Sequence, residues 1–330
     1  MQYKDVKTLI VIMILFSIMS IGKHPIVARG SIYTTNSIHI NNKSNNYGLS
    51  KGVPKSHTLL GNKQIDKKEN KQKQAKLDVL GKKIKILLGD DIDKFGMVYY
   101  DINSKKYIEI NSNEEFVAAS TIKVPINMLM YDMIKDKKID IKEKIAYQKV
   151  DFEDGAGILQ GMDLSKPIAI KTLSDYSIIY SDNIAINMIL RKVGNQNKYE
   201  YIEKIVGHPI VHKGNNITSK DYFKILERLY LNPEENEYYS SMIETMERTK
   251  YNDRIDKYIP HKIVAHKIGD YASCVNDTAI VYKDNPYILV VFTKELPQAK
   301  EVIAKVSKMI YDAQEWEKVG EDRKSTRLNS

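Results

Sequence analysis

The stretch Ala119-Ser120-Thr121-Ile122-Lys123-Val124-Pro125 opens the most apolar amphipathic run in the middle of the chain. Apolar residues then recur with helical spacing at Ile122, Ile126, Leu129, Met130, Met133 and Ile134. This spacing predicts a buried helix that begins at about Ser120. Pro125 is compatible with the helix, because few backbone N–H groups of a first turn have a partner within the helix.

Within this helix, Ser120 and Lys123 form the pattern Ser-x-x-Lys, which is typical of a nucleophile beside its base. Residues three apart lie on one helix face, so the two side chains can reach each other. Burial lowers the proton affinity of a lysine amine, which can then accept a proton from a hydroxyl. A serine at a helix N-terminus also lies beside free amide groups that favour negative charge. The pattern alone is weak, since Ser20 and Lys23 also match it.

The first 28 residues have the composition of an export signal. A basic start, Met1 to Lys7, precedes the apolar stretch Leu9–Ile21. This stretch is shorter than the roughly 20 residues that a membrane-spanning helix needs. We therefore expect residues 1–28 to be a signal peptide or a retained membrane anchor. The protein is then secreted or held at the extracellular face of the membrane.

Residues 29–76 are rich in Asn, Ser, Lys and Gln, which is typical of a disordered linker. They hold 10 basic and 2 acidic residues, and residues 1–28 hold 3 and 1. Of the chain's 51 basic and 42 acidic residues, 38 and 39 therefore remain from residue 77 onward. Nucleic acid requires a basic folded surface, so no nucleic-acid partner is expected. The basic linker either contacts anionic polymers of the cell envelope or is simply solvated.

Strand-like patterns at both ends of the sequence flank a helical middle. The expected elements up to residue 194 are a helix over 77–88, a hairpin of strands 96–102 and 106–110, a turn-rich loop over 154–161, a helix from a capping box at Thr172 to Ile179, a break at 181–183, and a helix ending at Val193 before Gly194. The later expected elements are helices over 221–230 and 237–249, strands over 263–268, 277–282 and 287–293, and a helix over 298–316.

This order predicts an α+β fold, in which one antiparallel sheet is assembled from both ends of the chain. The sheet is flanked by N- and C-terminal helices, and an all-α part is inserted. We assign residues 77–118 and 262–316 to the sheet part and 119–261 to the helical part. Residues 317–330 are expected to be a disordered tail. Cys274 is the only cysteine, so no intramolecular disulfide can form and a small buried role is expected.

Three short motifs occur in order along the chain: Ser120-Thr121-Ile122-Lys123, Ser181-Asp182-Asn183 and Lys267-Ile268-Gly269. Together they resemble the S-x-x-K, S-D-N and K-T-G motifs of the class A β-lactamases and penicillin-binding proteins. The likeness continues in the residues that follow the second and third motifs, and it covers roughly residues 77–315. An ordered set of this kind is far more specific than any one of its members.

The resemblance implies a role for each motif residue. Ser120 would be the acylated nucleophile, Lys123 the base that activates it, and Ser181 the relay of a proton to the leaving nitrogen. The expected binding groups are Asn183 for the acyl side-chain amide, Lys267 for positive charge near Ser181 and the substrate carboxylate, Gly269, and the backbone amides of Ser120 and Asp270 as the oxyanion hole.

The chain departs from this family in two places. Class A β-lactamases carry a glutamate in an omega loop that activates the water for deacylation. No Glu-x-x-Leu-Asn pattern occurs between Asn183 and Lys267, and the stretch His208–Thr218 is short for such a loop. Ile268 replaces the hydroxyl residue of the third motif, which removes a hydrogen bond to a β-lactam carboxylate worth about 1 kcal/mol.

These features predict an exported serine hydrolase that forms an acyl-enzyme on Ser120 and hydrolyses β-lactams or related cell-wall amides. The missing glutamate leaves a second interpretation: a penicillin-binding or sensing module, or a D,D-peptidase, that is acylated but deacylates slowly. No metal or cofactor is expected, because His208 and His212 lack the glutamate of a metalloprotease helix. The expected partner is a β-lactam or peptidoglycan-derived small molecule, and the protein is expected to be a monomer.

Overall fold

The computed structural model describes the backbone of residues 63–328 and the side chains of residues 72–314. The expected export segment, residues 1–28, and residues 29–62 of the expected linker lie outside the described residues. In the described part of the chain, no helix has the length and apolar character needed to cross a membrane.

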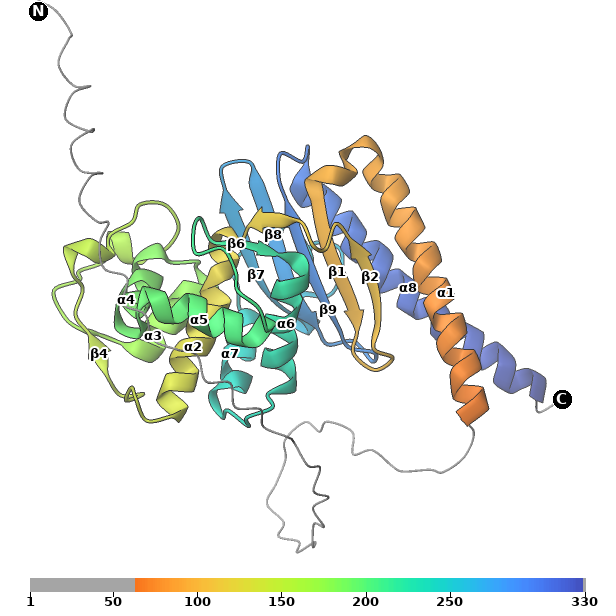
Figure 1. Ribbon diagram of the computed structural model, residues 1–330, viewed down its shortest axis with the longest axis horizontal. Coiled ribbons are helices and arrows are strands. Elements are labelled where there is room, and N and C mark those ends of the chain that lie inside the picture. Colours follow the sequence, from red (N-terminus) through yellow and green to blue (C-terminus); the bar gives the residue numbers. More distant parts are fainter. Residues whose placement is uncertain (1–62, 329–330) are drawn as a thin grey trace, which may run out of the picture. The chain divides into compact units, whose positions relative to one another are not determined.

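A five-stranded antiparallel sheet has the strand order β2-β1-β9-β8-β7 (Figure 1). Its strands are β1 (Phe95–Asp101), β2 (Lys106–Ile110), β7 (Val264–Tyr271), β8 (Cys274–Val281) and β9 (Tyr287–Thr293). β1 pairs with β9 along its whole length, with Phe95 opposite Thr293 and Asp101 opposite Tyr287. The predicted sheet, assembled from segments far apart in the sequence, is therefore confirmed.

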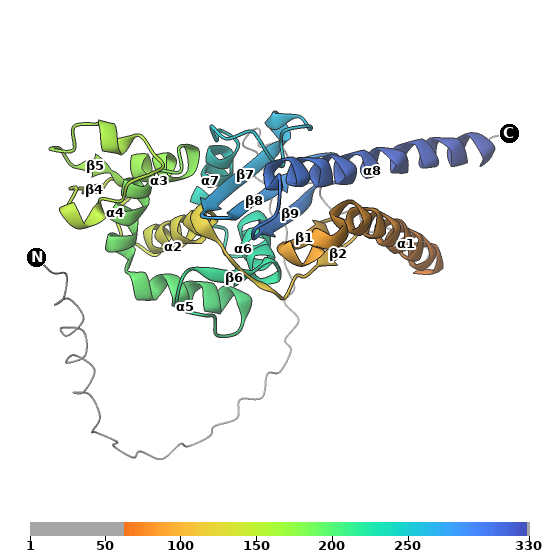
Figure 2. The same cartoon turned by 90° about the horizontal axis from the view of Figure 1, so that it is seen from above.

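The sheet separates two hydrophobic cores, because successive side chains of a strand point to opposite faces. On one face, alternate residues of β1 and β9 pack with α1 (Lys63–Leu88) and α8 (Ala299–Leu328). The intervening residues pack on the other face with the helical part of the chain. Figure 2 shows α1 and α8 on the same side of the sheet. The first set includes Met97, Tyr99, Leu289 and Val291, and the second Val98, Tyr100, Ile288 and Val290.

The helical part lies between β2 and β7 in the sequence. Its helices are α2 (Lys123–Lys135), α3 (Ile170–Ile179), α4 (Asn183–Val193), α5 (Asn195–Val206), α6 (Ser219–Leu231) and α7 (Tyr238–Met246). Two small antiparallel pairs join its loops: β3 (Glu115–Val117) with β6 (Asn216–Thr218), and β4 (Lys144–Ile145) with β5 (Ile168–Ala169). The remaining elements are the 3₁₀ turns η1 (Gly89–Lys94), η2 (Ala119–Ile122), η3 (Lys149–Asp151), η4 (Leu159–Gly161) and η5 (His261–Ile263).

Two helix starts differ from the sequence prediction. The helix expected from Ser120 begins as the 3₁₀ turn η2, and the α-helical hydrogen bonding of α2 starts only at Lys123. α3 begins at Ile170 and not at Thr172, so the predicted capping box does not form. Pairing of β5 with β4 fixes the residues just before α3, which explains the earlier start.

The two terminal helices are longer than the sequence predicted. α1 begins at Lys63, so residues 63–76 of the expected linker are helical, and α8 continues to Leu328, through most of the expected tail 317–330. Both segments are rich in Lys, Gln, Glu and Arg, which are good helix formers. This composition is therefore compatible with the helical backbone of both segments.

A buried histidine joins two buried carboxylates beside the third motif. The Nδ1 atom of His266 on β7 lies 3.0 Å from Oδ1 of Asp277 on β8, and Nε2 lies 3.4 Å from Oδ2 of Asp256. All three side chains are at most 1% exposed. Burial by itself disfavours the imidazolium, but the two carboxylates outweigh it and raise the pKa of His266 to about 9. His266 is therefore protonated at neutral pH.

Replacing His266 by alanine is expected to lower the free energy of unfolding by about 3–5 kcal/mol at pH 6, because two buried carboxylates lose their counter-ion. Denaturation in urea measures this change. Protonated His266 stabilises the fold in full at pH values below about 6.5, the pKa of a histidine in the unfolded chain. That contribution is lost as the pH rises through about 9. The difference between wild type and variant should therefore shrink in alkaline solution.

His261→Ala is a matched control, because His261 contacts the same Asp256 carboxylate at 2.7 Å but its side chain is 60% exposed. An exposed pair of this kind contributes at most about 1 kcal/mol. Equal effects of His261→Ala and His266→Ala would contradict the importance of the buried cluster.

Candidate active site

A cleft of roughly 680 Å³ is formed by β7, η2 and the helical part of the chain. Its walls come from η2 and the start of α2, the loop of residues 153–156, α4, α5 with the segment 214–216, and the end of β7. The lining residues with an ionisable side chain or a motif hydroxyl or amide are Ser120, Lys123, Glu153, Asp154, Asn183, Lys198, Asp270 and Tyr271. We refer to this space below as the cleft.

Ser120 lies on η2, and its hydroxyl has no hydrogen-bond partner in the described part of the chain. The preceding residue, Ala119, has a φ of 49°, a left-handed conformation that is rare outside glycine. Hydrogen bonds hold Ala118 in place: its N–H donates to the Asn215 carbonyl at 3.0 Å, and its carbonyl accepts from Thr121 Oγ1 at 2.7 Å. The strained turn thus keeps a free hydroxyl at the cleft wall.

Gly269 allows β7 to approach this turn closely. A Cβ atom at residue 269 would lie 2.7 Å from the Ala118 carbonyl oxygen and 3.0 Å from the Thr121 backbone nitrogen. Any side chain would therefore push β7 away from η2. The glycine of the third motif sets the width of the cleft beside Ser120, and the next residue, Asp270, lines it.

Lys123 is 3% exposed and is held by the second motif. Its Nζ donates to Asn183 Oδ1 at 2.8 Å and to Ser181 Oγ at 3.2 Å, and it also donates to the Ser181 carbonyl. Burial lowers the pKa of Lys123 to about 8, although Glu153 and Asp182 oppose this decrease. A substantial fraction of this amine is therefore neutral near physiological pH, as a base toward Ser120 requires.

The Ser181 hydroxyl lies between two buried lysines. It accepts from Lys267 Nζ at 3.0 Å, opposite its contact with Lys123. Lys267 is fully buried, and burial followed by the nearby Lys123 charge lowers its pKa well below the usual lysine value. Ser181 itself has a φ of 54°, a second strained non-glycine position in the site. The hydroxyl is thus positioned to pass protons between the two amines.

The loop that precedes the second motif is fastened to it by Asp182. The Asp182 carboxylate accepts from the N–H groups of Ile158, Leu159 and Ala185, so it caps α4 and anchors the loop at the same time. Gly157, with a φ of 126°, passes so close that a Cβ would lie 2.4 Å from this carboxylate. Asp182, the middle residue of the second motif, therefore holds this loop against the start of α4.

The end of β7 is supported by a buried arginine. Arg254 is 1% exposed, and its guanidinium donates to the Asn276 carbonyl at 2.7 Å and to Asp270 Oδ2 at 2.5 Å. The side chain of Ile268 is also buried, at 4% exposure. Where the family pattern has a hydroxyl, this strand therefore has an apolar contact.

The structure brings every predicted site residue together. Ser120, Lys123, Asn183 and Asp270 line the cleft. Ser181 and Lys267 are buried and reach the cleft through their hydrogen bonds to Lys123 and to each other. Gly269 packs closely against η2, next to the cleft.

Four residues of the site were not predicted from the sequence: Glu153, Asn187, Lys198 and Arg254. Asn187 could have been found, because it lies four residues after Asn183 on the same face of α4. Glu153 directly precedes the loop that the sequence marked as turn-rich. For Lys198 and Arg254 no local pattern exists, since only the folding of distant segments places them here.

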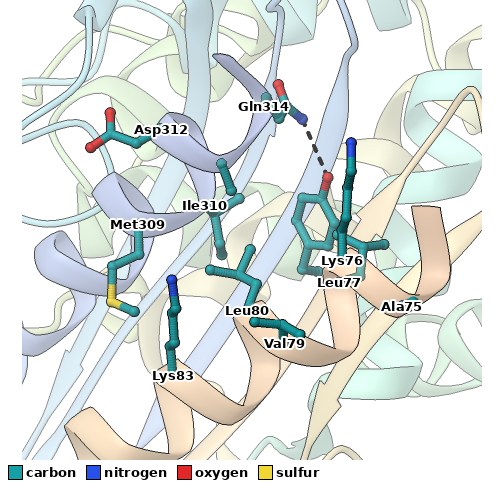
Figure 3. Close-up of a pocket in the computed structure, with 12 residues that line it drawn as sticks. Ala75, Lys76, Leu77, Val79, Leu80, Lys83, Met309, Ile310, Asp312 and Gln314 are labelled. Carbon is teal, nitrogen blue, oxygen red and sulfur yellow. Dashed lines mark hydrogen bonds between the residues drawn. The ribbon is translucent and has the colours of Figure 1, made fainter. Parts of the chain in front are cut away.

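The other features of the described residues have no comparable polar chemistry. No group of three or more His, Cys, Asp or Glu side chains is placed to hold a metal ion in the described part of the chain. A second pocket lies between α1 and α8 and is lined mainly by apolar side chains such as Leu80 and Ile310 (Figure 3). One hydrogen bond there joins Gln314 to the Tyr99 hydroxyl at 3.3 Å. Cys274 is buried and unpaired, as predicted.

Comparison with known proteins agrees with this geometry. A model of the "Beta-lactamase enzyme family" matches residues 79–314. β-Lactamase BRO-1 of Moraxella catarrhalis is 25% identical over 60% of this chain and 73% of its own length. β-Lactamase VEB-1 of Pseudomonas aeruginosa is 23% identical over 70% and 88%.

Solved structures share the fold. PBP-A has a TM-score of 0.66 at 22% identity, over 72% of this chain and 96% of that chain. TLA-1 extended-spectrum β-lactamase has a TM-score of 0.66 at 20% identity, over 72% and 98%. These matches confirm the predicted family and the predicted α+β fold. The chain belongs to the β-lactamase enzyme family.

Proposed function

We propose that this protein hydrolyses β-lactams or related cell-wall amides through an acyl-enzyme on Ser120. The observation that carries the proposal is the Ser181 hydroxyl held between the amines of Lys123 and Lys267, with Lys123 and the free hydroxyl of Ser120 lining the same cleft. Such substrates lie outside the cytoplasm, which agrees with the expected export segment, residues 1–28.

In the proposed acylation, neutral Lys123 takes the proton of Ser120, and the Ser120 oxygen attacks the carbonyl carbon of the amide. The backbone amides of Ser120 and Asp270 stabilise the oxyanion, and each such donor contributes about 3–4 kcal/mol. The C–N bond then breaks, and the proton passes from Lys123 through Ser181 to the leaving nitrogen. The 3.2 Å contact between Lys123 Nζ and Ser181 Oγ provides this path.

Substrate binding is assigned to the two ends of the cleft. The Asn183 side chain, fixed by Lys123 and by the Asp154 carbonyl at 3.2 Å, faces the acyl side-chain amide. We assign the substrate carboxylate to Lys267, beside the Ser181 hydroxyl that its Nζ contacts at 3.0 Å. The buried Ile268 side chain offers no hydroxyl to that carboxylate, which favours substrates that do not depend on this contact.

A second function is favoured by one observation. The connection between α5 and β6 contains no Asp or Glu, so it supplies no carboxylate to activate water. A protein that acylates but clears the adduct slowly would act as a penicillin-binding or sensing module, or as a sluggish D,D-peptidase.

Ser120→Ala should abolish covalent labelling by a fluorescent penicillin, because it removes the nucleophile. Labelling is read as a fluorescent band after denaturing electrophoresis. Ser240→Ala, which removes an exposed hydroxyl of α7, is the matched control and should label like the wild type. Persistent labelling of Ser120→Ala would rule out Ser120 as the nucleophile.

The acylation rate should rise as the pH increases through about 8, because Lys123 must be neutral to accept the Ser120 proton and burial lowers its pKa to about 8. Stopped-flow mixing with a chromogenic penicillin between pH 6 and 10 measures this rate. The midpoint belongs to the coupled amines of Lys123 and Lys267. An acylation rate that stays constant from pH 7 to pH 9 would contradict the role of Lys123.

Mixing the protein with excess chromogenic cephalosporin decides between the two functions. Continuous product release at a steady rate is expected for the proposed hydrolase. A burst of one product per protein molecule, followed by almost no further release, supports the slow-deacylating alternative. Ser120→Ala gives the baseline for both outcomes, since it removes acylation altogether.

A further inference from the structure

The hydrolysis of an acyl-enzyme ester requires a base that takes a proton from the attacking water. Of the described residues that line the cleft, three carry a carboxylate: Glu153, Asp154 and Asp270. Their contacts differ, and the differences separate them as candidates for this base.

Two of the three carboxylates are occupied by other groups. Asp270 accepts a charge-assisted hydrogen bond from the buried Arg254 guanidinium at 2.5 Å, so this carboxylate is already engaged by the side chain that supports the end of β7. The Asp154 side chain turns back onto its own loop and accepts from the Gly155 N–H at 2.8 Å.

Glu153 has the contacts that a water-activating base needs. Its Oε2 accepts from Asn187 Nδ2 at 2.9 Å, so α4 orients the carboxylate, while the group stays open to water. Asn187 also donates to the Asp151 carbonyl at 3.3 Å, which fixes the amide. Of the carboxylates near Lys123, Glu153 acts on this amine most strongly, ahead of Asp182. Glu153, Lys123 and Ser120 all line the same cleft.

We propose that Glu153 is the general base that activates water to hydrolyse the acyl group from Ser120. This inference rests on the proposed function, because it presupposes the ester on Ser120. The Glu153 carboxylate takes one proton from a water, and the water oxygen attacks the ester carbonyl carbon. The tetrahedral intermediate collapses, the bond between that carbon and Ser120 Oγ breaks, and the proton returns from Glu153 to the Ser120 oxygen. The products are the free acid and the unmodified enzyme.

Lys198 is the competing base. This side chain is 4% exposed, lines the cleft and donates to Asn215 Oδ1 at 2.8 Å, and it forms no ion pair within the described residues. Burial lowers the pKa of Lys198 to about 8. A lysine base would make deacylation faster as the pH rises through 8. A deacylation rate that shows no such rise excludes Lys198 as the base.

The decisive experiment follows the lifetime of the penicillin adduct in Glu153→Gln by mass spectrometry of the intact protein. Glutamine keeps the shape and can still accept from Asn187, but it cannot take the water proton. The adduct should therefore persist about 10²- to 10⁴-fold longer than in the wild type, while the acylation rate changes less than about threefold. Glu153→Asp, which keeps a carboxylate, should recover part of the deacylation rate.

Glu200→Gln is the matched control, since Glu200 lies on α5 outside the cleft and pairs with Gln196. The adduct of this variant should clear at the wild-type rate, and deacylation by the wild type should be independent of pH from 6 to 9.

Three results would overturn the role of Glu153. The first is a Glu153→Gln adduct that clears at the wild-type rate. The second is an adduct of the wild-type protein that is never cleared. The third is deacylation that is slowed by Lys198→Met and not by Glu153→Gln. For the first and third results, loss of the adduct in Ser120→Ala leaves the proposed function intact, whereas a wild-type adduct that is never cleared supports the slow-deacylating alternative. An adduct that survives Ser120→Ala removes the proposed function together with this inference.

Discussion

The site depends on the burial of two lysine amines around one hydroxyl. Lys123 and Lys267 are almost inaccessible to water, and neither forms an ion pair within the described residues. An unpaired buried charge costs several kcal/mol, so each amine loses its proton more readily than it would in water. The Ser181 hydroxyl accepts from both amines and connects them. Because these groups come from α2, β7 and the start of α4, the base exists only when the sheet part and the helical part are packed together.

Strained turns and close packing hold the serine hydroxyls and the lysine amines of the site in position. Ala119 and Ser181 adopt left-handed backbone conformations that cost about 1–3 kcal/mol each outside glycine. Neighbouring residues hold these two conformations. The hydrogen bonds of Ala118 fix the turn at Ala119, and those of Asp182 fix the turn at Ser181. Gly269 lets β7 approach η2 to within van der Waals contact. The hydroxyls of Ser120 and Ser181 are therefore positioned by rigid turns, which lowers the reorganisation needed during a reaction.

A carboxylate that lines the cleft can come from different places in the sequence. The connection between α5 and β6 is short and carries no acid, whereas the loop between η3 and η4 carries Glu153 and Asp154 to the cleft. A proton acceptor needs only the right distance and orientation, and Asn187 provides the orientation for Glu153. On our proposal for Glu153, the distinction between a hydrolase and a slow-deacylating binding protein depends on this one side chain.

The sequence alone determined the local elements and the chemistry of the three motifs. The hairpin at 96–110, the break at Ser181 and the strand pattern around Lys267 follow from short-range periodicity and turn residues, and so did the α+β fold. Lys198 and Arg254 became site residues only in the tertiary structure. Their partners, Asn215 and Asp270, lie on other elements, and no local pattern encodes such contacts. The pKa of Lys123 likewise depends on burial by distant segments, because desolvation is a property of the packed molecule and not of the residue.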